Sequence, residues 1–192
     1  MASGMETGEI DVAAIEHRAE RVLAEVPDYV WDGATLPVPV EEIVDSVHGL
    51  LVRDVEDLTE APNCPVTDPA AISGLLLTSR GEIWVNAAEA RQWPGRRRFT
   101  ICHELGHWVM HRSGQQSLFC RHSTVQPEEE SATTRPPLPV TEEEANHFAA
   151  ALLMPAELIR KQYRETGGDF DQMCERFGSS GAAMGKRLHQ AI

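Results

Sequence analysis

The sequence predicts an α+β domain in which helices pack on one small antiparallel sheet. Two short runs rich in β-forming residues, ISGLLLT and EIWVNA, are separated by Ser79, Arg80 and Gly81, a spacing typical of a hairpin. On both sides of these runs, apolar residues recur at helical spacing. The chain has 192 residues, 42% of them hydrophobic, which is enough for one domain with a core.

The N-terminal part predicts two helices and a strand before the hairpin. Apolar residues recur every three or four positions from Ile15, so the first helix is expected to end before Pro27. Pro39 is expected to begin a short helix that Gly49 ends, and residues 50–55 are expected to form a strand. The segment APNCPVTDP then predicts a loop.

After the hairpin, the pattern is helical. Pro94 marks the start, and Gly114 the end, of a helix of about seventeen residues, RRRFTICHELGHWVMHR. The polar, proline-rich stretch HSTVQPEEESATTRPPLPV predicts a surface loop. Thr141, with Glu144 three residues later, has the pattern of a capping box for the helix EEEANHFAAALLM. The remaining runs, PAELIRKQYRE, DFDQMCERF and AAMGKRLHQAI, predict a helix and a short helix-turn-helix-like tail.

Composition excludes several classes of partner. The net charge of −13 repels phosphate backbones, so we expect no direct binding of nucleic acid. No stretch approaches the roughly 18 apolar residues that a membrane span needs, and we expect a cytoplasmic protein. The cysteines are widely spaced and are expected to be free thiols: Cys64, Cys102, Cys120 and Cys174.

The run HELGH, from His103 to His107, carries the chemistry. Two histidines four residues apart lie on one face of a helix and can bind one cation, with Glu104 beside them as a general base for a metal-bound water. Gly106 lies on the same side and would let substrate or another helix come close. A random chain of this composition would contain the pattern at a rate on the order of a few per cent, so it is only moderately specific.

A catalytic zinc usually has three protein ligands, and Glu144 is the predicted third. On a helical wheel centred on the buried Phe148, Glu144 lies near the apolar stripe, whereas Glu142 and Glu143 point away. A buried carboxylate needs a cation or strong donors, which a zinc ion would supply. The alternative is that Glu144 only completes the capping box.

Two further groups near the motif allow two interpretations each. His111 continues the series on the catalytic face and is either a further ligand or electrophile, or a buried, hydrogen-bonded histidine near the helix end. The three arginines at residues 96–98 are either a substrate patch or, as we expect in so acidic a chain, a solvated helix start.

Taken together, ISG, RRFTICHELGHWVMH, EEANHFAAALLMP and ERFGSSGAAMGKRL resemble the ImmA/IrrE family of zinc peptidases over roughly residues 37–188. The resemblance implies a minimal gluzincin-like metallopeptidase fold. It also implies Zn²⁺ bound by His103, His107 and Glu144, with Glu104 as the catalytic base. Known members cleave helix-turn-helix repressors of the Xre type, and others accompany antitoxins.

The expected function is therefore a zinc-dependent endopeptidase that cleaves a transcriptional repressor or an antitoxin by attack of a metal-activated water. The alternative is a zinc-containing module that sequesters such a protein without cutting it. A third possibility, a DNA-binding regulator that uses the tail, is opposed by the negative charge. We expect a metallopeptidase domain over residues 1–164 and a helical tail over residues 165–192 packed on it, and the sequence does not indicate an oligomeric state.

Overall fold

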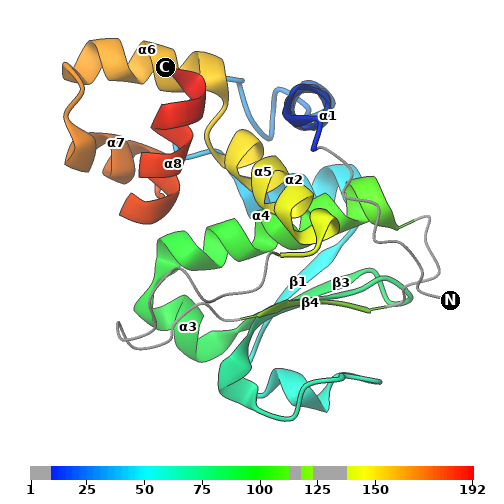
Figure 1. The fold of residues 1–192 in the computed structure, drawn as a ribbon. Coiled ribbons are helices and arrows are strands. Elements are labelled where there is room, and N and C mark those ends of the chain that lie inside the picture. The colour runs from blue at the N-terminus through cyan, green and yellow to red at the C-terminus, as the bar shows by residue number, and fades with distance from the viewer. Residues whose placement is uncertain (1–9, 113–117, 123–137) are drawn as a thin grey trace, which may run out of the picture.

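The computed structural model describes residues 10–112, 118–122 and 138–192, and confirms the α+β class. A long helix, α4, lies between the sheet and α5, and helices α6 to α8 gather at one end of this pair (Figure 1). The helices are α1 (Val12–Ala24), α2 (Val40–His48), α3 (Ala87–Gln92), α4 (Pro94–His111), α5 (Val140–Leu153), α6 (Ala156–Thr166), α7 (Phe170–Phe177) and α8 (Gly181–Ala191). Two short 3-10 helices are η1 (Leu58–Glu60) and η2 (Pro69–Ala71).

The sheet is mixed rather than purely antiparallel, which corrects the sequence prediction. Its strands are β1 (Leu51–Val55), β2 (Ile72–Leu77), β3 (Glu82–Asn86) and β4 (Leu118–His122), in the order β1-β3-β2-β4. β2 pairs with β3 and β4 in antiparallel fashion, and β3 pairs with β1 in parallel. The physical reason is that the segment between β1 and β2 reverses the chain, and the hairpin then returns β3 in the direction of β1. The sequence did not predict β4.

The helix boundaries follow the predicted signals with one exception. Gly49 ends α2 in the left-handed conformation, with φ of 62°, as the sequence predicts. At α5, however, the helix already begins at Val140, and Pro139 precedes it without a side-chain cap. The predicted capping box of Thr141 and Glu144 is therefore wrong. Most of the proline-rich stretch before α5 falls in residues 123–137, outside the described residues.

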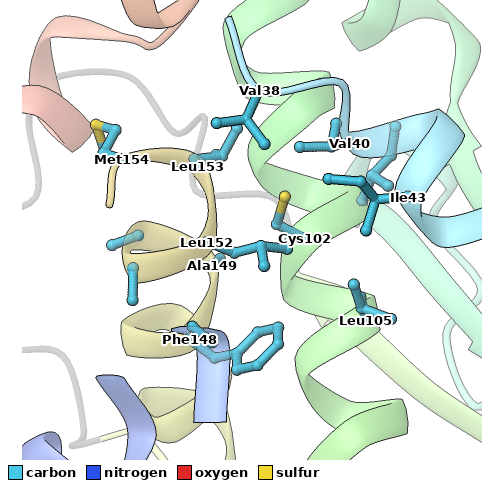
Figure 2. Packing of buried hydrophobic residues seen from close by; sticks show 14 of the residues in the cluster. Val38, Val40, Ile43, Cys102, Leu105, Phe148, Ala149, Leu152, Leu153 and Met154 are labelled. Carbon is cyan, nitrogen blue, oxygen red and sulfur yellow. The ribbon is translucent and has the colours of Figure 1, made fainter. Parts of the chain in front are cut away.

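Small side chains let α4 and α5 pack closely. A side chain added at Gly106 of α4 would lie 3.1 Å from Cδ1 of Phe148 and 3.3 Å from Cα of Ala145, both on α5. Figure 2 shows apolar residues in the space between the two helices, among them Cys102 of α4 and Phe148 and Ala149 of α5. The expectation that Gly106 admits a second helix is confirmed, and the contact fixes α5 beside the HELGH run.

Several buried or partly buried arginines join helices and strands that are far apart in the sequence. Arg187 of α8 is 1% exposed, donates to the carbonyl oxygen of Met154 at 2.8 Å and pairs with Glu16 of α1. Arg97 pairs with Glu41 and Asp54. The arginines at the start of α4 therefore join elements, whereas the sequence suggested a solvated helix start.

Two simpler expectations can be compared with the described residues. Cys64, Cys102 and Cys174 are free thiols, as predicted, whereas the side chain of Cys120 lies outside the described part. Within the described ranges, no helix is long and apolar enough to cross a membrane. The division into residues 1–164 and 165–192 stays a prediction.

Candidate metal centre

His103 and His107 project from one face of α4 into the interior, as the HELGH spacing predicts. They are 1% and 0% exposed, and their Nε2 atoms lie 3.1 Å apart. The residues of α4 from Thr100 to His107 are all buried, because the sheet covers one side of this stretch and α5 the other. Two imidazole nitrogens therefore converge in a nearly dry environment.

Glu142, and not Glu144, lies beside the two histidines. Its Oε2 is 3.2 Å from Nε2 of His103, and its Oε1 is 3.2 Å from Nε2 of His107. One donor atom from each of the three residues lies within 4.8 Å of the others. Glu144 instead places its Oε2 2.8 Å from Nε2 of His111. The geometry therefore corrects the predicted third ligand from Glu144 to Glu142.

The face of α5 that meets α4 is not the one centred on Phe148. The face of α5 that meets α4 is formed by Ala145 and Ala149, because small side chains allow the close contact at Gly106. At 100° per residue, the direction of Glu142 is only about 20° from that of Ala149. A wheel centred on the alanines would have placed Glu142 inward.

A hydrogen bond between His103 and a residue of α5 orients the His103 ring. Its Nδ1 lies 3.0 Å from Oδ1 of Asn146. An amide oxygen only accepts hydrogen bonds, so Nδ1 of a neutral His103 carries the proton and Nε2 keeps its lone pair. That lone pair faces His107 and Glu142. The sequence pattern did not indicate this contact of Asn146.

A chain of two hydrogen bonds, from His107 to His111 and from His111 to Glu144, orients His107. The Glu144 carboxylate accepts from Nε2 of His111, whose Nδ1 lies 3.2 Å from Nδ1 of His107. In a neutral His111, Nδ1 is then the acceptor and His107 donates from its own Nδ1, which leaves the His107 Nε2 lone pair facing the centre. The geometry thus favours the hydrogen-bonded interpretation of His111.

Burial sets the charge of the candidate ligands. Burial lowers the pKa of His103 to about 4, although Glu142 opposes this shift. Burial opposes ionisation of Glu142, but its contacts with His103 and His107 lower its pKa well below the usual value. At neutral pH His103 is therefore a neutral imidazole and Glu142 an ionised carboxylate, the forms that bind metals.

Glu104 lies beside this group, against the sheet. It is 0% exposed, and neither carboxylate oxygen has a hydrogen-bond partner among the described residues. Its Oε1 lies 3.3 Å from the point where a side chain on Gly74 of β2 would begin, so the glycine leaves room for it. Burial, and then the charge of Glu142, raise the pKa of Glu104 well above its usual value, while Arg121 lowers it.

The three donors fit a zinc ion. Tetrahedral zinc at about 2.0–2.1 Å from its ligands separates them from one another by about 3.3 Å. Here the two Nε2 atoms lie 3.1 Å apart, each lies 3.2 Å from a different oxygen of Glu142, and one donor atom from each of the three residues lies within 4.8 Å of the others. Two nitrogens and one carboxylate suit zinc better than the hard cations Ca²⁺ and Mg²⁺, which prefer oxygen ligands. The unpartnered Glu104 carboxylate gives such a centre a base.

Comparison with known proteins agrees with this geometry. A family model described as Peptidase_M78, IrrE N-terminal-like domain, matches residues 67–189, from before β2 into α8. A comparison with curated proteins finds no match. The family match covers more than half of the chain and includes the HELGH run and the helix of Glu142. The chain therefore belongs to the Peptidase_M78 family of IrrE N-terminal-like domains.

Proposed function

We propose that this protein is a zinc-dependent endopeptidase with His103, His107 and Glu142 as metal ligands and Glu104 as catalytic base. The observation that carries the proposal is the convergence of the two Nε2 atoms with the Glu142 carboxylate, 3.1–3.2 Å apart, beside an unpartnered carboxylate. A zinc ion held there would supply Lewis-acid chemistry, which lowers the pKa of a bound water and polarises a carbonyl group.

The role of Glu104 follows from its surroundings. It is fixed on α4 next to His103, and its carboxylate oxygens have no hydrogen-bond donor among the described residues. A carboxylate in this state is available to accept a proton from the attacking water. The same group then carries the proton to the leaving amine nitrogen as the peptide bond breaks. Gly74 leaves the room for this carboxylate against the sheet.

We further propose that the substrate is a helix-turn-helix repressor or an antitoxin in the cytoplasm. The support is the family membership together with the resemblance of the EEANHFAAALLMP and HELGH runs to repressor-cleaving peptidases. The net charge of −13 favours a protein partner over direct binding of nucleic acid.

The deciding experiment compares Glu104→Gln with the wild type. Both proteins are loaded with one zinc and incubated with a repressor or antitoxin encoded beside this gene, and with a pool of synthetic peptides, and new termini are identified by mass spectrometry. We expect Glu104→Gln to keep its zinc and to lose cleavage by at least about 10²-fold, because only the proton acceptor is removed. Glu143→Gln, on the exposed side of α5, is the matched control and should cleave normally.

The same variant tests the sequestration alternative. If zinc-loaded Glu104→Gln relieves repression in cells as well as the wild type does, the protein acts by binding and the peptidase proposal is wrong. Loss of the cellular effect together with retained zinc and retained partner binding supports proteolysis.

A further inference from the structure

Arg121 of β4 projects from the sheet toward Glu104. It pairs in register with Gly74 of β2, and directly opposed residues of antiparallel strands project to the same side of a sheet. That side is the one that α4 covers, since Oε1 of Glu104 lies 3.3 Å from where a Gly74 side chain would begin. Among the described residues, β4 is an edge strand of the sheet.

The guanidinium of Arg121 packs against an aromatic ring, but one of its nitrogen atoms lacks a hydrogen-bond acceptor among the described residues. Its central carbon lies 4.7 Å from the centre of the Phe99 ring of α4, which orients the planar group. Nη1 is buried and has no hydrogen-bond partner in the part of the chain that the structure describes. A buried charged donor without an acceptor is unfavourable, so this N–H is suited to an acceptor that arrives from outside.

The positive charge of Arg121 acts electrostatically on residues of the candidate metal centre. Burial lowers its pKa to about 10, and Glu104 and Glu142 oppose that shift, so the group stays protonated at neutral pH. Its positive charge in turn lowers the pKa of both His103 and Glu104. A fixed cation with a free N–H therefore stands next to the base and the ligands.

We propose that Arg121 is a catalytic residue that donates a hydrogen bond to the substrate carbonyl oxygen as it becomes an oxyanion, an inference that rests on the proposed peptidase function. When the water oxygen bonds to the carbonyl carbon, the electron pair of the C=O π bond moves to the carbonyl oxygen, and one water proton passes to Glu104. When the C–N bond breaks, the oxygen pair re-forms the carbonyl group and the amine takes the proton. Arg121 exchanges no proton and only stabilises the negative charge.

The test uses the full-length, zinc-loaded protein and the peptide that the wild type cleaves best. In Arg121→Met, we expect kcat to fall about 10²- to 10³-fold with KM and zinc content unchanged, the loss typical of one oxyanion donor. Binding of the phosphonamidate analogue of that peptide, whose tetrahedral phosphorus mimics the oxyanion, should weaken by a similar factor. Arg121→Lys should recover part of both losses, because it keeps the charge but not the planar fork. Arg53→Met, on the opposite edge strand, is the matched control.

The outcomes separate this inference from the proposed function. Normal kcat and normal phosphonamidate binding in Arg121→Met overturn the inference while wild-type cleavage still supports the peptidase. A loss confined to peptides with a free C-terminal carboxylate, and absent for the same peptides amidated, would show that Arg121 anchors a chain end instead. Loss of zinc from Arg121→Met would likewise show a structural role. If the wild type cleaves no peptide and binds no phosphonamidate, the proposed function itself fails.

Discussion

Variants of the three consecutive glutamates at the start of α5 distinguish a metal ligand from a residue that only orients a ligand. Glu142→Gln removes one of the three proposed protein ligands, Glu144→Gln removes only the partner of His111, and Glu143→Gln changes an exposed side chain. Zinc sites with four ligands bind with about 10–16 kcal/mol, or about 2.5–4 kcal/mol per ligand, so loss of Glu142 should weaken zinc binding roughly 10²- to 10³-fold.

Glu144→Gln should have a smaller effect, because it acts through two hydrogen bonds, of 2.8 Å to His111 and of 3.2 Å from His111 to His107. Loss of such an orienting partner weakens metal binding by about 10- to 100-fold. Glu143→Gln should bind zinc as the wild type does. The assay is equilibrium competition with a fluorescent zinc chelator. A larger loss of affinity in Glu144→Gln than in Glu142→Gln would refute the ligand assignment.

Two other predictions concern stability and are measured by urea unfolding. Gly106→Ala should destabilise the protein by about 1 kcal/mol, because overpacking outweighs the gain in helix propensity, whereas Gly185→Ala, with open space around it, should stabilise it by up to about 1 kcal/mol. Equal effects of the two would contradict the close helix contact. Hydrogen bonds, first from the backbone of Thr35, lower the pKa of Asp32 to about 2, so the ionised form is stabilised in the folded state. The wild type should therefore be more stable than Asp32→Asn above pH 4, and the difference should shrink as the pH falls through 2; a difference that stays constant from pH 4 down to about pH 1 would contradict it.

Local sequence signals predicted the elements that carry the centre. Periodicity and proline or glycine punctuation gave α2, α4 and the β2–β3 hairpin, since these features act over a few residues. The parallel pairing of β1 with β3 joins residues about thirty apart through a long connection, and no local pattern encodes it. β4 was missed because its short run between polar segments lacks the length and alternation of a predicted strand.

The residues of the candidate site also differ in whether local sequence patterns or long-range contacts determine their positions. The spacing of His103, Glu104 and His107 acts within one helix, so the sequence predicted that they lie together on α4, while their roles stay a proposal. Arg121 joins them only because β4 pairs with β2 at Gly74, which is a tertiary fact. Glu142 could have been found from the sequence, but only by recognising that small residues, and not the largest apolar one, mark the face where two helices meet most closely.

An inward carboxylate such as Glu144 needs a cation or a strong hydrogen-bond donor, and the structure satisfies that need without a metal. His111 supplies the donor, and the carboxylate thereby fixes which nitrogen of His111 faces His107. Asn146 does the same for His103 from two residues further along α5. The glutamate and asparagine of the EAN run thus each orient a different histidine. Asn146 binds Nδ1 of His103 directly, and Glu144 acts on Nδ1 of His107 only through His111, so both Nε2 atoms are left facing the Glu142 carboxylate. One helix therefore carries the proposed carboxylate ligand together with the supports of the two histidines.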